Sequence, residues 1–171
     1  MDVVIEVQEL EPDAFAPFGW LPVAEGDGAD EHQQLAFEWA DAHLNFISHS
    51  PDELVRMPEG AVVEHMYRHA THTQALMPVN TGAVLVVAPA GADFSTEADV
   101  QALRAFALRP LDVVVLHQGT WHWGPFPLGA EPVRLLNLQG RRYRDDNLSI
   151  EPGAALDVKV VVAMPEVTAC S

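Results

Sequence analysis

The chain has one cysteine and few basic residues, and both shortages limit what it can be. Because Cys170 has no partner among the 171 residues, no disulfide can form within the chain, and a reducing compartment is expected. Nine lysines and arginines stand against 25 aspartates and glutamates, which gives a formal net charge of −16. Nucleic acids and anionic lipids bind proteins through cations, so this balance disfavours nucleic acid and membrane surfaces as partners.

Long apolar segments are also missing. The longest apolar stretch, residues 82–91, is too short to span a bilayer. Residues 1–6 lack the basic region and the long apolar segment that begin a secretory signal peptide. We therefore expect a cytoplasmic protein.

Turn-forming residues and short apolar runs dominate the sequence instead. Thirteen prolines and 11 glycines lie between short runs of valine, leucine and phenylalanine, which favours an all-β protein over a helical bundle. The length suits a single domain, residues 1–171. One or two short helices are expected, beginning near Pro12 and near Ser95 or Thr96. The expected strands are residues 3–7, 35–39, 44–48, 62–69, 72–76, 82–90, 104–109, 111–117, 132–139 and 158–163.

Two pairings follow from these strand assignments. Residues 35–39 and 44–48 are expected to pair as antiparallel strands. Residues 111–117 and 132–139 are expected to form a hairpin-like pair across a tryptophan-rich loop. The strand at 158–163 is expected at a sheet edge or at an interface.

Residues 62–78 carry three of the eight histidines within a segment that otherwise reads as strand. If the segment is extended, the two-residue repeat places Tyr67 and His69 on one face. His72 and Gln74 share a face of the next extended run. A bend between the two runs would bring His69 and Gln74 towards one point.

A second histidine cluster follows a valine-rich run. His117 ends that run beside a glycine turn, and Trp121 and His122 come next. Imidazole is the commonest transition-metal ligand, and a metal site typically takes three or four donors from separate strands. His69, Gln74 and His117 would supply such donors. Surface histidines and hydrogen-bonded core histidines remain the alternative interpretation.

Several motifs resemble the ureidoglycolate lyase family, in the same order and at similar spacings. They are residues 13–19, Arg68-His69, Thr73-Gln74-Ala75, Pro78, residues 103–106, His117 and Trp121-His122. The resemblance implies a cupin-type jelly-roll β-barrel and a homodimer. It also implies an enzyme that releases urea from ureidoglycolate and leaves glyoxylate, a small-molecule carboxylate substrate.

Two positions depart from the family's pattern. Tyr67 stands where the family usually has a glutamate, directly before its Arg-His pair. Tyrosine is a poor ligand for most divalent metals while it keeps its proton, with a reference pKa near ~10. His72 lies where the family tends to have a Pro-Leu-Gly segment, and it would be a substitute donor. The site has therefore drifted or been retuned for another small acid.

Within the resemblance, a divalent transition metal (nickel, manganese or zinc) would be held by His69, Gln74 and His117. It would chelate the hydroxyl and carboxylate groups of the substrate. Because three neutral donors bind less tightly than a set with a carboxylate, weak binding or no metal is also an option.

Proton transfer and carboxylate binding are assigned to other side chains. His122 or His72 would carry the proton, since imidazole titrates near neutral pH. The hydroxyl of Tyr67 is a third catalytic candidate. The candidate substrate-binding residues are Arg68, Arg104 and Trp121.

Two other functions are compatible with the same residues. One is a related cupin enzyme that acts on another small hydroxy or keto acid. The other is a non-catalytic small-acid-binding cupin in which Tyr67 marks a lost metal site. The basic residues 141–144 form either a solvated loop or a clamp for a carboxylate.

Overall fold

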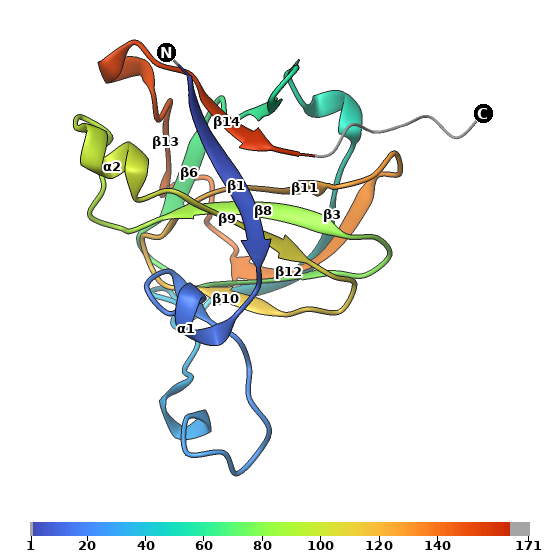
Figure 1. Ribbon diagram of the computed structural model, residues 1–171. Helices are drawn as coiled ribbons and strands as arrows, with labels where there is room; N and C mark the ends of the chain where they lie inside the picture. Colours follow the sequence, from blue (N-terminus) through green and yellow to red (C-terminus); the bar gives the residue numbers. More distant parts are fainter. Residues whose placement is uncertain (1, 165–171) are drawn as a thin grey trace.

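Short valine-rich segments separated by turns form 14 strands in the computed structural model, which describes residues 2–164 (Figure 1). Cys170 lies outside the described residues. The strands are β1 Val3–Glu9, β2 Gly19–Trp20, β3 Ala42–His49, β4 Arg56–Met57, β5 Gly60–Val62, β6 Met66–His69, β7 Gln74–Pro78, β8 Ala83–Ala88, β9 Arg104–Leu108, β10 Val114–Leu116, β11 Trp121–Pro127, β12 Val133–Gly140, β13 Asn147–Ile150 and β14 Val160–Ala163.

Within the described residues, two short helices accompany the strands, α1 Pro12–Phe15 and α2 Glu97–Gln101. Pro12 begins α1, and the Thr96 side chain caps α2 by accepting a hydrogen bond from the Asp99 amide. Both starts match the sequence prediction. Three single 3-10 turns span Asp30–His32, Pro51–Glu53 and Ala154–Leu156. Within residues 2–164, no helix has the length and apolar character needed to cross a membrane.

The strands form two sheets. The larger runs β13-β6-β11-β8-β9-β1-β14-β5-β4, and the smaller runs β2-β10-β7-β12-β3. Figure 1 shows the larger sheet curling over the smaller one, with α1 and α2 at the periphery. The expected all-β, cupin-like fold with two short helices is confirmed.

Strand β8 is the buried centre of the larger sheet. Each of its six residues is buried, as the continuous apolar run predicts. It lies between β11 and β9. Phe15, Phe18 and Phe106 pack edge to face beside it, with ring centroids 5.3 Å apart for Phe15 and Phe106. These rings anchor α1 to the core.

The parallel strands β1 and β14 join distant parts of the chain. β1 pairs with β9 through Val7–Glu9 and with β14 through Val3–Glu6. On its other side β14 pairs with β5, so it is an interior strand. Of the two places expected for this strand, a sheet edge is therefore wrong.

Two expected pairings differ in the structure. Residues 35–39 form a single bridge, Phe37 with His72, because their backbone bonds go to the turn after β6. β3 pairs with β12 instead. The tryptophan-rich segment is the strand β11, held between β6 and β8. β10 and β12 are not a hairpin, since β7 lies between them in the smaller sheet.

Candidate functional site

A pocket of about 350 Å³ opens between the two sheets. The smaller sheet contributes Gln74 from β7 and Gln139 from β12, and the larger sheet contributes His69 from β6 and His122 from β11. All four side chains are buried, with between 5% and 8% of their surface exposed. Buried polar groups at a cavity between two sheets are the usual mark of a small-ligand site.

Strand periodicity explains which residues of β6 reach the pocket. Tyr67 and His69 both line it, as the two-residue repeat predicts, and His65 lies on the same wall. His122 is the partner of Tyr67 across the β6–β11 ladder, so it enters from the neighbouring strand. The chain then bends between β6 and β7, and Gln74 joins the wall. The face of β6 that carries Tyr67 and His69 is therefore the one that lines the pocket.

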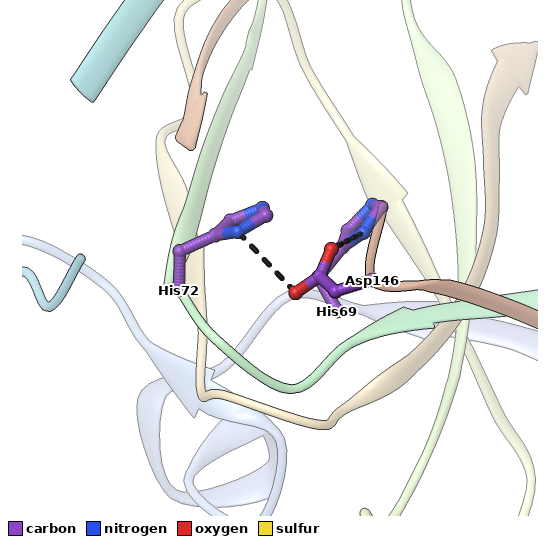
Figure 2. Close-up of side chains that lie close together, drawn as sticks. All are labelled: His69, His72 and Asp146. Atoms are coloured by element: carbon purple, nitrogen blue, oxygen red, sulfur yellow. Dashed lines mark hydrogen bonds and ion pairs between the residues drawn. The ribbon is translucent and has the colours of Figure 1, made fainter. Parts of the chain in front are cut away.

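Asp146, in the loop before β13, lies beside two of the histidines, His69 and His72 (Figure 2). Its Oδ1 lies 3.2 Å from Nδ1 of His69, and its Oδ2 lies 3.7 Å from Nδ1 of His72. Because a carboxylate only accepts hydrogen bonds, Nδ1 of His69 is the donor. The backbone amide of Thr71 donates to Oδ2 at 3.0 Å, and the Thr71 hydroxyl donates to the same atom.

The pairing of β13 with β6 holds Asp146 in this place. Asn147 pairs with His69 in the ladder, so the residue before it arrives beside the histidine. Sequence reasoning missed Asp146, because residues 140–147 read as a polar loop. The adjacent Asp145 has the same side chain and is exposed. Only the register of β13, which the sequence does not reveal, distinguishes the two carboxylates.

Burial keeps the three histidines of the site neutral. It lowers the pKa of His122 to about 3, and the neighbouring His69 contributes to this lowering. Burial also lowers the pKa of His69, against the opposing attraction of Asp146. The pKa of His72 is lowered by burial and then by His69, again against Asp146. Neutral imidazoles have a lone pair to offer to a proton or a metal.

The rings of the histidines pack against one another. The centroids of His69 and His72 are 4.7 Å apart, and those of His69 and His122 are 5.7 Å apart. Nδ1 of His122 lies 3.3 Å from the carbonyl oxygen of Thr120, so it donates there and leaves Nε2 as the acceptor. A Cβ at Gly140 would lie 2.7 Å from Nδ1 of His72. The ring of His72 therefore requires glycine at this position.

His117 does not join this group. It is exposed, its Nε2 lies 3.3 Å from the carbonyl oxygen of Ala16, and its ring packs against Trp20 with 5.4 Å between centroids. Leu116 before it points into the core, so alternation sends His117 outward. The expected donor set of His69, Gln74 and His117 does not converge in the structure.

The three expected substrate-binding residues also lie away from the pocket wall. Arg68 faces the other side of β6, where its guanidinium stacks 4.6 Å from the ring centroid of Trp121 and donates to the carbonyl of Ala90 at 2.9 Å. Trp121 is buried in the core on that side. Arg104 is exposed and donates to the carbonyl of Gln101 at 2.7 Å. These side chains fasten loops to the larger sheet.

Acidic and neutral groups line the pocket. Glu53 and Glu64 are part of its wall, and among residues 2–164 no arginine or lysine lines it. A cation lies one contact away, because Nε of Arg144 donates to the hydroxyl of Tyr143 at 3.1 Å and Tyr143 lines the pocket. Of the arginines at 141–144, Arg144 is thus linked to the site.

Comparison with known proteins gives a family match over most of the chain. The family model described as ureidoglycolate lyase matches residues 2–152. No curated protein matches the chain. Among solved structures, a dTDP sugar isomerase from Desulfovibrio desulfuricans G20 is similar, with 15% sequence identity and a TM-score of 0.47 over 80% of this chain and 84% of the other.

Proposed function

Because the chain belongs to the ureidoglycolate lyase family, we propose that the pocket between its two sheets is where it releases urea from ureidoglycolate and leaves glyoxylate. Membership of the family makes the chain a lyase. The observation that carries the assignment to this pocket is the hydrogen bond from His69 to Asp146. It fixes a neutral imidazole in the pocket wall.

The reaction needs one proton acceptor and one proton donor. Ureidoglycolate has a carbon that carries a hydroxyl, a carboxylate and a ureido nitrogen. When the hydroxyl loses its proton, the oxygen electrons form the carbonyl of glyoxylate, and the carbon–nitrogen bond breaks. The departing nitrogen takes up a proton and leaves as urea. A site for this reaction must hold both groups beside the same carbon.

His69 is the proposed proton acceptor. Its Nδ1 hydrogen is committed to Asp146, so the lone pair is on Nε2. Asp146 also stabilises the imidazolium that forms when the proton arrives, as a carboxylate does for a catalytic histidine. The lowered pKa of His69 keeps this lone pair available at neutral pH. Asp146 acts through His69 and is a positioning residue.

Tyr67 and His122 are paired residues on neighbouring strands, and both are proposed to act on the substrate. Tyr67 is 39% exposed, and its hydroxyl is a hydrogen-bond donor that can act on the departing nitrogen. His122 stays neutral, and its Nε2 can accept a hydrogen bond from the substrate hydroxyl. Because they pair across β6 and β11, the two side chains lie side by side.

A divalent transition metal is the alternative to this hydrogen-bonded arrangement, and His69, His72 and Asp146 would be its ligands. The donor atoms of these residues lie within 4.8 Å of one another. Two imidazoles and a carboxylate suit nickel, manganese or zinc. His69 would give up its hydrogen bond to Asp146 in this role, because Nδ1 cannot donate to the carboxylate and bind a metal at the same time.

When bound, such a metal supplies positive charge beside a pocket whose wall is acidic, and so attracts the carboxylate of the substrate. Of its three ligands, His69 lines the pocket. His122 then remains as the neutral imidazole that is free to accept the proton. The donor set His69, Gln74 and His117 is not proposed, because His117 is directed outward.

Two further properties complete the proposal. We propose that the protein is a homodimer and that it is cytoplasmic. Light scattering of the purified chain tests the first, and fractionation of cells that produce it tests the second.

The direct test is to measure urea and glyoxylate released from ureidoglycolate. We expect both products in equal amounts from the wild type, and a loss of about 100-fold or more in His69→Gln, in line with general base catalysis. His117→Gln is the matched control, because it changes an exposed histidine outside the pocket, and its rate should stay within about twofold. Release of no urea, with turnover of another small hydroxy or keto acid, would replace this function by the related one.

A further inference from the structure

Four carboxamide side chains form a line across the smaller sheet, next to the histidines. Asn45 comes from β3, Asn137 and Gln139 from β12, and Gln74 from β7. Asn137 pairs with Asn45 in one ladder, and Gln139 lies two residues further along the same face of β12. Asn45, Gln74 and Gln139 line the pocket, and Asn137 is fully buried behind them.

Hydrogen bonds fix how each amide is oriented. Nε2 of Gln74 donates to Oδ1 of Asn137 at 2.8 Å and to Oε1 of Gln139 at 3.2 Å. Nδ2 of Asn137 donates to Oδ1 of Asn45 at 2.9 Å. Each amide oxygen in the line that accepts a bond has its own NH₂ group on the other side. The NH₂ groups of Asn45 and Gln139 are therefore donors at the pocket wall.

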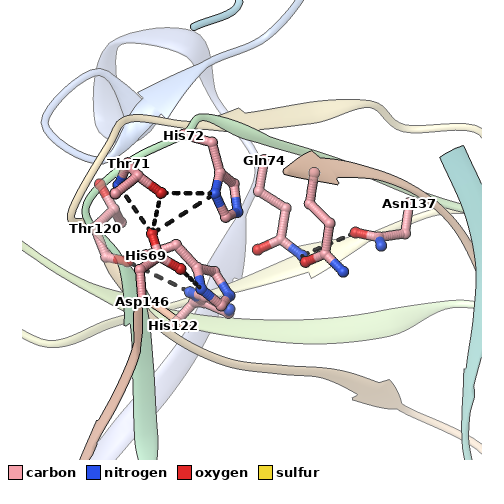
Figure 3. Close-up of polar contacts among 9 residues, drawn as sticks. His69, Thr71, His72, Gln74, Thr120, His122, Asn137 and Asp146 are labelled. Atoms are coloured by element: carbon pink, nitrogen blue, oxygen red, sulfur yellow. Dashed lines mark hydrogen bonds and ion pairs between the residues drawn. The ribbon is translucent and has the colours of Figure 1, made fainter. Parts of the chain in front are cut away.

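Gln74 offers the opposite group. Its side chain is 6% exposed, and within residues 2–164 its buried Oε1 has no hydrogen-bond partner. In Figure 3 this oxygen points towards the side with His72 and His69, while the nitrogen points towards Asn137. A buried acceptor without a partner is costly, and a ligand that donates to it removes that cost. The wall therefore combines one acceptor with two donor groups.

This combination is complementary to a planar group that has both a carbonyl oxygen and N–H hydrogens. We propose that Gln74, Gln139 and Asn45 bind the ureido end of the substrate. The ureido N–H donates to Oε1 of Gln74, and the ureido oxygen accepts from Gln139 and Asn45. A carboxylate offers only acceptors, so it would leave Oε1 of Gln74 unpaired beside a negative charge. This inference rests on the proposed function. The subsite would favour ureido acids over plain hydroxy acids.

The acidic wall points the same way. Glu53 and Glu64 line the pocket, and within residues 2–164 no lysine or arginine lines it. Glu53 is paired with His49 in this wall, whereas Glu64 repels a carboxylate but not the NH₂ of a ureido group. In the proposed arrangement the ureido end occupies the amide side, and the carboxylate and hydroxyl lie towards the histidines.

Two unreactive ligands separate the ends of the substrate. N-carbamoylglycine has the ureido group and the carboxylate, and glycolate has the hydroxyl and the carboxylate without the ureido group. Calorimetric binding of both is measured for the wild type and for Gln139→Met, which keeps the length of the side chain. Gln74 keeps Asn137 as an acceptor in this variant. Gln118→Met, at an exposed glutamine outside the pocket, is the matched control.

We expect Gln139→Met to bind N-carbamoylglycine about 10-fold or more weakly than the wild type. Its affinity for glycolate, and both affinities of the control variant, should stay within about twofold. An equal loss for both ligands, or no loss for either, overturns the inference. Asn45→Leu, at a half-buried position, gives the same comparison if Gln139→Met does not fold.

The outcome is independent of the test of the proposed function. Suppose that the wild type releases no urea, but that Gln139→Met selectively weakens the binding of N-carbamoylglycine. The ureido subsite then stands and the lyase assignment fails. If the wild type releases urea and Gln139→Met shows no selectivity, the lyase assignment stands and the subsite fails.

Discussion

Asp146 accepts a hydrogen bond from Nδ1 of His69, although the two residues are 77 positions apart in the chain. The contact exists because β13 pairs with β6 and places the loop before β13 against the histidine. It links the pocket wall to a segment that contributes few of the lining residues. Changes to this contact or to its surroundings should therefore have measurable effects.

Replacing Asp146 by Asn should lower the rate of urea release about 10- to 100-fold, with substrate affinity little changed. The amide of Asn can donate to Nδ1 of His69, which moves the imidazole hydrogen to Nε2 and removes the acceptor from the pocket. Steady-state kinetics with a pH profile measure the effect. Asp145→Asn is the control, because it makes the same chemical change at the exposed neighbour. Equal rates in the two variants would show that Asp146 does not position the histidine.

Zinc, nickel or manganese should bind at up to one ion per chain and raise the melting temperature. At a free concentration of 100 times the Kd, a ligand of the folded state adds about 2.7 kcal/mol. His72→Ala should abolish this shift, because it removes one of the three donors, and His117→Ala should preserve it. Metal analysis after desalting, with thermal melts in parallel, gives both readouts. Retention of metal in His72→Ala together with its loss in His117→Ala would reinstate His117 as a ligand.

Arg68→Ala should destabilise the fold and leave substrate affinity unchanged. The guanidinium loses its contact with Trp121 and its bond to Ala90, for which about 1 to 2 kcal/mol is expected. Denaturant titration measures the loss, and the Michaelis constant for ureidoglycolate should stay within about twofold. Arg104→Ala should change neither quantity by much, because this side chain is exposed. If either variant raised the Michaelis constant about 10-fold or more, that arginine would contact the substrate.

His122 should make the protein less stable in mild acid. Its pKa is about 3 in the folded chain and near 6.5 in the unfolded chain, so between these values the unfolded state binds a proton that the folded state does not. Neutral His122 makes its full contribution to the free energy of unfolding above about pH 6.5. This contribution falls by up to about 1.4 kcal/mol for each pH unit below that value. Urea titrations of the wild type and His122→Asn between pH 4 and pH 7 measure the slope. An identical slope in the two proteins would contradict a neutral His122.

Local patterns in the sequence were enough to predict much of the fold. The apolar run of β8, the proline at α1 and the threonine cap of α2 each act within a few residues, so the sequence alone predicts them. Pairing between distant strands was harder. The tryptophan-rich segment reads as a loop because of Gly124 and Pro125, yet its tryptophans are buried and it forms β11.

The candidate site divides in the same way. Tyr67, His69 and Gln74 follow from the repeat of two adjacent runs and one bend, and they line the pocket as expected. The placement of His117 depends on which face of a strand end is turned inward. The placement of Asp146 depends on the register of a distant strand. A histidine after a valine-rich run looks like an inward ligand, but the buried Leu116 before it takes that position.

The parallel pair of β1 and β14 also sets an order for folding during synthesis. β1 leaves the ribosome early, and one of its edges can be covered only when residues near Val160 have been made. Until then Val3 and Val4 have unpaired backbone groups that another strand could bind. Long-range pairings of this kind slow folding, because a large loop must close before the contact forms. A stalled nascent chain that ends before β14 should therefore aggregate more readily than one that includes it.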